Sequence, residues 1–218
     1  KILIDFGKEC GVMKTPLRYQ MSEYDCGPTA MLDAVSFLFE REEIPPEIIR
    51  NIMLYCLDCY NAEGITGKSG TSCAAMMFLS NWLNNFGQIG QLAVSSRYLA
   101  GEQVFLGAGS AINAALHRGG AAVVRLFLDE WHYVLLTGEQ DGAVEVFDPY
   151  LCECPLPDAE IRMVEDHPYA YNRIVPDRFF NREELALYAL GPFGTREAIL
   201  LFNDKTKLPE ETAIEYFI

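Results

Sequence analysis

The apolar residues of this chain follow a helical spacing in its first half. From Cys26 to about Arg41 they recur every three or four positions, which predicts an amphipathic helix. Pro28 is tolerated in the first turn of that helix, and Asp25 is in the position of an N-cap. Further helices are expected over three ranges: 46–57, 72–86 (closed by Gly87) and 110–118.

After residue 120 the pattern becomes that of strands. Four segments rich in β-branched and aromatic residues are expected to be strands: AAVVRLFL (121–128), WHYVLLTG (131–138), AVEVFDPY (143–150) and REAILLF (196–202). Residues 1–19 are expected to form an extended lead-in, and residues 210–217 a short closing helix. Helices first and antiparallel strands second predict an α+β fold, in one domain of residues 1–218 with room for an insertion at 152–195.

Composition and charge limit the class of protein and its partners. Half of the 218 residues are hydrophobic, as in a folded soluble domain, and no apolar run is long enough to span a membrane. The formal net charge of −14 disfavours nucleic acid and anionic lipid surfaces as partners.

The first residues do not have the pattern of a secretory signal, so the cytoplasm is the expected location. The start at Lys1 leaves a processed N-terminus and a removed signal open. The oligomeric state has no signal in the sequence.

The cysteine pattern favours free thiols. Seven cysteines at irregular spacing argue against a disulfide framework. Two close pairs, Cys56/Cys59 and Cys152/Cys154, leave a four-thiolate zinc site as an alternative. The pairs are far apart and Cys56 falls inside an apolar helical run, so neither a metal nor a cofactor is expected.

Cys26 has the features of a nucleophile. It stands in QMSEYDCGPTAM (20–31), at the expected start of a helix, where the partial positive charge and free N–H groups lower a thiol pKa. Its own N–H and the side-chain amide of Gln20 can hold an oxyanion. Burial as a small hydrophobic residue is the alternative for Cys26, and a structural amide is the alternative for Gln20. The negative charge of Asp25 opposes thiolate formation.

His132 is the candidate general base. It begins a predicted strand, and Asp148 ends the next one. A three-residue loop over 140–142 places His132 opposite Tyr150 and Asp148 diagonally across from it on the same inward face. A two-residue loop over 141–142 would place the two side chains on opposite faces. A turn-forming Asp-Pro is the alternative role for Asp148.

The other two histidines fit structural positions. His117 lies beside Arg118 at the end of a predicted helix, where a cation pairs with the helix dipole. His167 lies in an acidic turn and is expected to be exposed.

Together these sequence motifs resemble those of a known family. The spacing Q-x5-C with DCGP (20–28), then WHYVLLTG and VFDPY, resembles the C39 and C39-like cysteine peptidases of the papain-like superfamily. The resemblance covers about residues 15–150. It implies a papain-like fold, with Cys26 as nucleophile, His132 as general base, Asp148 as its orienting partner and Gln20 as oxyanion donor. The leader-peptide specificity of the transporter-fused members is not carried over, because no transporter domain is present.

The expected function is a thiol hydrolase that cleaves peptide bonds through an acyl-enzyme, with a peptide or acyl-amide substrate. An acyltransferase or amidase using an amine acceptor and a catalytically silent peptide-binding module are the alternatives. The loop over 62–72 and the region 152–195 are expected to flank the cleft. Candidate substrate-binding residues are Asp25, Gly27, Gly70, Thr71 and Trp131, although a core tryptophan would give the same pattern.

Overall fold

The protein is described by a computed structural model that covers residues 13–152 and 156–209. Four α-helices precede or interrupt a seven-stranded sheet: α1 (Cys26–Leu38), α2 (Pro46–Cys56), α3 (Cys73–Gln88) and α4 (Ala111–His117). The strands are β1 (Val94–Ala100), β2 (Ala121–Leu128), β3 (Glu130–Gln140), β4 (Ala143–Phe147), β5 (Arg162–Met163), β6 (Arg173–Pro176) and β7 (Glu197–Asn203). They lie in the order β1-β7-β2-β3-β4-β6-β5, with every neighbouring pair antiparallel. The predicted α+β class is therefore confirmed.

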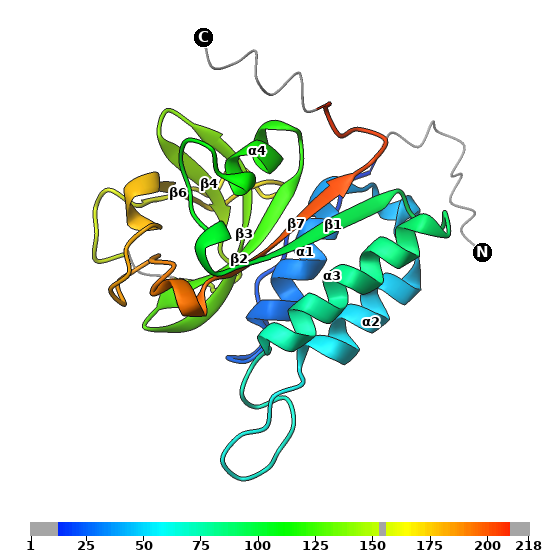
Figure 1. Cartoon of the computed structure of the whole chain (residues 1–218), viewed down its shortest axis with the longest axis horizontal. Helices are drawn as coiled ribbons and strands as arrows, with labels where there is room; N and C mark the ends of the chain where they lie inside the picture. The colour runs from blue at the N-terminus through cyan, green and yellow to red at the C-terminus, as the bar shows by residue number, and fades with distance from the viewer. Residues whose placement is uncertain (1–12, 153–155, 210–218) are drawn as a thin grey trace, which may run out of the picture.

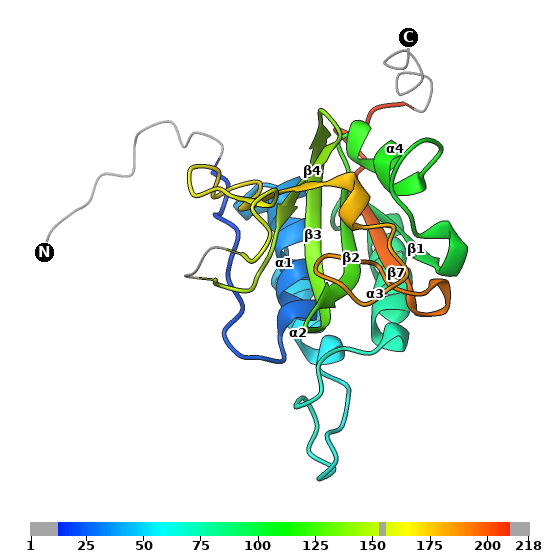
Figure 2. The ribbon, with the colours of Figure 1, turned by 90° about the vertical axis from the view of Figure 1, so that its left-hand side faces the viewer.

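The helices cover both faces of the sheet. α1, α2 and α3 lie together on one side, and α4 lies on the other (Figures 1 and 2). Successive residues of a strand point to opposite faces, so the central strands must be apolar on both sides. This explains why β2 and β7 read as continuous apolar runs rather than as an alternation.

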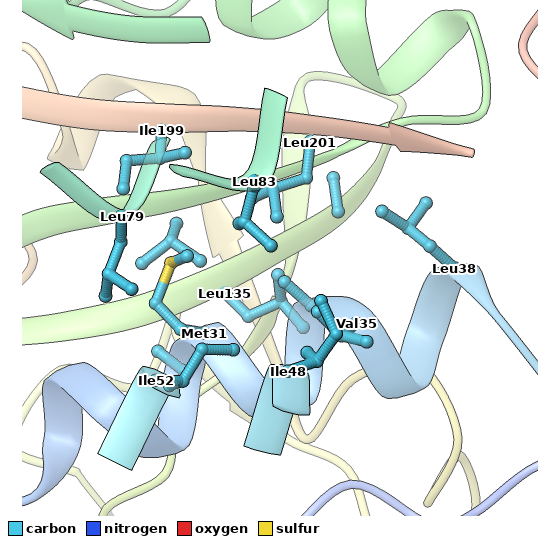
Figure 3. Packing of buried hydrophobic residues seen from close by; sticks show 14 of the residues in the cluster. Met31, Val35, Leu38, Ile48, Ile52, Leu79, Leu83, Leu135, Ile199 and Leu201 are labelled. Atoms are coloured by element: carbon cyan, nitrogen blue, oxygen red, sulfur yellow. The ribbon is translucent and has the colours of Figure 1, made fainter. Parts of the chain in front are cut away.

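The larger core cluster fixes α1 against the sheet. Apolar side chains of three helices converge on side chains of β3 and β7 (Figure 3): Met31, Val35 and Leu38 from α1, Ile48 and Ile52 from α2, Leu79 and Leu83 from α3, and Leu135, Ile199 and Leu201 from the sheet. All of these side chains are less than one-tenth exposed. Their packing sets the position of the N-terminus of α1, where Cys26 lies.

Several expected elements need correction. Gly87 does not close α3, which continues to Gln88; a Cβ at Gly87 would come within 1.9 Å of the Val94 carbonyl oxygen, so this glycine permits a close backbone approach. The strands β1, β5 and β6 were not predicted, and the last two fall in the region 152–195. The expected closing helix lies outside the described residues.

The loop predicted between β3 and β4 is wrong, but the predicted register beyond it is correct. The turn has two residues, Asp141 and Gly142, both with positive φ, and Gln140 lies opposite Ala143. A β-bulge between Leu136 and Gly138 adds one residue to β3 and shifts the pairing by one. Beyond the bulge Leu136 lies opposite Val146, which is the register that the three-residue loop would have produced.

One buried carboxylate of α1 generates a testable prediction. Asp33 is fully buried; its Oδ1 accepts from the Arg18 N–H at 2.9 Å, and its Oδ2 has no hydrogen-bond partner among the described residues. Burial raises the pKa of Asp33 to about 8, against the opposing effect of Arg18. Because the folded state then binds a proton that the unfolded state has released, stability falls as pH rises from about 4 through 8.

We expect Asp33→Asn to remove this loss. The variant should gain on the order of 3 kcal/mol of unfolding free energy over the wild type between pH 5 and pH 8.5. Urea unfolding at both pH values measures it. Asp141→Asn, which replaces an exposed aspartate in the turn between β3 and β4, is the control and should show no such trend. An equal trend in both variants would contradict the assignment to Asp33.

Candidate active site

Cys26 is the first residue of α1 and faces a cavity of about 540 Å³. The lining of this cavity includes all four residues proposed from the sequence as catalytic: Gln20, Cys26, His132 and Asp148. The Cys26 residue is 7% exposed, so its thiol meets the cavity without being open to bulk solvent. The arrangement brings together residues separated by up to 128 positions in the chain.

His132 and Asp148 form a buried pair. His132 Nε2 lies 2.9 Å from Asp148 Oδ1, and the two residues are 7% and 1% exposed. With Nε2 donating to the carboxylate, Nδ1 is the ring nitrogen left for Cys26. Burial acts to lower the pKa of His132, but the hydrogen bonds to Asp148 and to Cys26 outweigh it and raise the pKa to about 10. The imidazolium form is therefore favoured beside the thiol at neutral pH.

Asp148 is held by donors on several sides. The Tyr188 hydroxyl donates to its Oδ2 at 2.6 Å, and the Tyr150 N–H donates to Oδ1 at 2.9 Å. Asn172 accepts from the Asp148 N–H and donates to its carbonyl oxygen, both at 2.8 Å. Burial alone would raise the pKa of Asp148, but the hydrogen bonds from His132, Tyr188 and Tyr150 outweigh it and lower the pKa. Asp148 therefore stays ionised and oriented toward His132.

Asp25 does not cap α1 as expected. Its side chain makes no cap hydrogen bond and instead accepts from the Met21 N–H at 3.0 Å and from both the N–H and the hydroxyl of Ser22 at 2.7 Å. These donors stabilise the Asp25 carboxylate within the turn before the helix. The first N–H groups of α1 thus receive no side-chain cap, and their partial positive charge is available to Cys26.

Gln20 reaches the cavity from the segment before α1. Its N–H donates to the Pro149 carbonyl oxygen at 2.8 Å, which ties this segment to the residue after Asp148. Its side-chain Nε2 donates to the Ser22 carbonyl oxygen at 2.8 Å, which leaves one amide N–H for a ligand. Oxyanion binding by this group stays a prediction.

The candidate substrate-binding residues divide into two groups. Trp131 lines the cavity, whereas Asp25, Gly27, Gly70 and Thr71 are not among the lining residues. A Cβ at Gly27 would lie 2.2 Å from Thr71 Oγ1, so the Thr71 side chain, and not substrate, occupies the space beside this glycine. The loop between α2 and α3 ends in this contact and otherwise extends away from the body of the protein (Figures 1 and 2).

Trp131 is fixed by its neighbours. The Arg125 guanidinium carbon lies 4.4 Å from its ring centroid, and the Phe127 ring meets it edge-on at 5.9 Å. A Cβ at Gly191 would come within 2.7 Å of the indole ring, so this glycine permits the close approach. Trp131 therefore presents a fixed aromatic wall to the cavity.

Several residues of the site were not predicted from the sequence. Tyr188, Asn172 and Arg173 come from the region that showed no readable period, yet they surround Asp148 or line the cavity. No motif in the sequence marks them. They are found only when β6 and the segment before β7 are placed in space.

The remaining cysteines and histidines give no second catalytic centre among the described residues. Within these residues no three His, Cys, Asp or Glu side chains are grouped to hold a metal ion, and Cys154 of the proposed zinc set lies outside them. Cys56 is fully buried, and burial raises the pKa of its thiol. His117 ends α4 with its Nε2 3.4 Å from Glu139, and His167 is exposed, as expected.

Two comparisons with known proteins gave no match. No protein-family model and no curated protein matches the chain. Among the described residues, none of the helices has the length and apolar character needed to cross a bilayer.

We expect Tyr188→Phe to weaken the site through Asp148. Loss of a buried hydrogen bond to a charged group should lower the free energy of unfolding by about 1.5–3 kcal/mol. Alkylation of Cys26 by iodoacetamide at pH 6.5 should slow severalfold, because Asp148 then holds the imidazolium less firmly. Urea unfolding and mass-spectrometric rates measure the two effects.

Tyr133→Phe is the matched control for this experiment. The Tyr133 hydroxyl donates to Glu197 Oε1 at 2.6 Å and is buried, but Tyr133 does not line the cavity. Its loss should destabilise the fold without slowing alkylation of Cys26. An equal slowing in both variants would contradict the role given to Tyr188.

Proposed function

We propose that the protein is a thiol hydrolase with a papain-like fold that cleaves amide bonds through an acyl-enzyme on Cys26. The observation that carries the proposal is the His132–Asp148 hydrogen bond of 2.9 Å in the wall of the cavity that Cys26 also lines. A nucleophile, a base and an orienting carboxylate are the parts that acyl transfer requires. The resemblance of the surrounding strings to the C39-like peptidases supports the same assignment.

The reaction follows from the positions of these groups. The Cys26 thiolate attacks the carbonyl carbon, and the developing oxyanion is held by the Cys26 N–H and the free N–H of the Gln20 amide. His132 gives its proton to the leaving amine as the C–N bond breaks, which produces a thioester on Cys26 and the free amine. Water, deprotonated by His132, then attacks the thioester, releases the acid and regenerates the thiol.

The papain-like assignment rests on how the nucleophile and its partners are divided between elements. Cys26 begins a helix packed on one side of an antiparallel sheet, while His132 is the third residue of β3 and Asp148 follows β4. In this division the helix supplies the positive end of its dipole and the sheet supplies a rigid base. Both contributions stabilise a thiolate–imidazolium pair.

Transfer of the acyl group to an amine is the second candidate function. Three exposed acidic residues line the cavity and attract a cationic acceptor: Glu23, Asp129 and Glu130. Hydrolase and acyltransferase share every step up to the thioester. They differ only in whether water or an amine reaches it.

Acylation of Cys26 tests the function directly. With p-nitrophenyl acetate, intact-protein mass spectrometry should show one acetyl group on Cys26, which Cys26→Ala should abolish and His132→Ala should form at least about a thousandfold more slowly. Cys73→Ala is the control, because Cys73 is an exposed thiol outside the cavity and its loss should change nothing. Acetylation that survives Cys26→Ala and disappears with Cys73→Ala would overturn the proposal.

Partition of the acyl-enzyme then separates the two functions. We expect a pool of peptidyl aminomethylcoumarins to be hydrolysed, with glycine amide having no effect on the ratio of acid to coumarin. A new acyl-glycine amide product would instead favour the acyltransferase. Loss of turnover with retained peptide binding in Cys26→Ala would support an enzyme, whereas wild type that binds these peptides without turnover would favour the silent module.

A further inference from the structure

Arg173 is a buried cation in the wall of the same cavity. It begins β6 and pairs with Val146 of β4, so its side chain shares a face of the sheet with Asp148, two residues further along. Arg173 is 3% exposed and lines the cavity together with Cys26. The proposed chemistry at Cys26 gives this guanidinium no role.

The hydrogen bonds of Arg173 are incomplete. Nη1 donates to the Asn172 carbonyl oxygen at 2.9 Å, and the guanidinium also contacts the Tyr188 hydroxyl. Nε has no hydrogen-bond partner, and among the described residues no carboxylate forms an ion pair with Arg173. A buried charge without a partner is costly, so an anionic ligand that paired with this guanidinium would relieve the cost.

Arg196 shows what a purely structural buried arginine looks like in this protein. It is equally buried, at 3% exposed, but each nitrogen donates to a backbone carbonyl: Nε to Gly191 at 2.7 Å, Nη1 to Val104 at 3.1 Å and Nη2 to Asn181 at 2.9 Å. Arg196 does not line the cavity of Cys26. The contrast distinguishes Arg173, which lines the cavity with its Nε unpartnered, from an arginine whose nitrogens are all satisfied by backbone carbonyls.

We propose that Arg173 binds a carboxylate of the substrate, so that the preferred substrates of Cys26 carry a carboxylate close to the scissile amide. The proposal rests on the proposed function and defines its substrate class. A guanidinium fork matches a carboxylate in geometry and charge. A single guanidinium neutralises a monoanion, whereas a dianionic phosphate would meet uncompensated repulsion from Glu23, Asp129 and Glu130 at the rim.

Two alkylating agents of almost equal size test whether Arg173 binds a carboxylate, and they require no known substrate. Iodoacetate carries a carboxylate and iodoacetamide a neutral amide, and both alkylate a thiolate. Their rates at Cys26 are divided by their rates with N-acetylcysteinamide to remove intrinsic reactivity. The acidic rim and the net charge of −14 act against iodoacetate, so a normalised preference for it requires a cation in the cavity; the candidates are the His132 imidazolium and Arg173, which the Arg173 variants separate.

We expect wild type to prefer iodoacetate and to show saturation with it. Arg173→Gln should lower the normalised iodoacetate rate about tenfold or more relative to the iodoacetamide rate of the same variant. Arg173→Lys, which keeps the charge but not the fork, should retain part of the preference. Arg162→Gln removes an exposed arginine of β5 outside the cavity and should behave as wild type.

Competition in wild type keeps the proposal falsifiable if the Arg173 variants do not fold. Butyrate should protect Cys26 from iodoacetamide at concentrations where butyramide does not. Absence of both the iodoacetate preference and protection by butyrate would overturn the role of Arg173. The pH profile with iodoacetamide tests the Cys26–His132 pair separately, so a failure of the substrate proposal is distinguishable from a failure of the proposed function.

Discussion

The candidate site depends on one buried carboxylate. Asp148 is almost wholly removed from solvent, and an ionised carboxylate in that position is stable only if donors surround it. His132, Tyr188 and the Tyr150 N–H supply them. Because Tyr188 precedes β7 and Asn172 precedes β6, the orientation of His132 depends on segments far from it in sequence. Any change that opens this network should weaken His132 as the proposed base and, through it, the thiolate proposed at Cys26.

Helix α1 brings Cys26, the proposed nucleophile, to this network of hydrogen bonds. The core between α1, α2, α3 and the sheet holds the N-terminus of α1 in place, and the Thr71 contact to Gly27 fixes it further (Figure 3). The bulge in β3 sets the side of the sheet on which His132 lies. Helix packing and strand register are therefore both needed to assemble three side chains in one cavity.

Much of this could be predicted from the sequence, because periodicity and helix-start chemistry are local signals. The helix headed by Cys26 and the strands that carry His132 and Asp148 follow from such signals, and so does the pairing of the last two. That pairing was reached with the wrong loop: Asp141-Gly142 is typical of a two-residue turn, but the bulge in β3 leaves no mark in the sequence, and the two shifts in register cancel.

The parts that could not be predicted depend on contacts between distant segments. The Thr71 side chain leaves no room for a side chain at Gly27. The Asp25 carboxylate accepts a hydrogen bond from the Ser22 N–H instead of capping the helix. The Tyr188 hydroxyl donates to Asp148 from an irregular segment. A residue pattern does not encode such distances. The same holds for Arg173, whose burial and incomplete hydrogen bonds appear only in three dimensions.

The central claim is that Cys26 and His132 form a thiolate–imidazolium pair. The most direct test is the rate of Cys26 alkylation by iodoacetamide against pH, followed by mass spectrometry, in wild type, His132→Ala and the exposed-histidine control His167→Ala. The account predicts a fast plateau that extends below about pH 6 in wild type and in the control and is lost in His132→Ala. A rate that rises only near the free-thiol pKa of about 8.5, unchanged by His132→Ala, would contradict it.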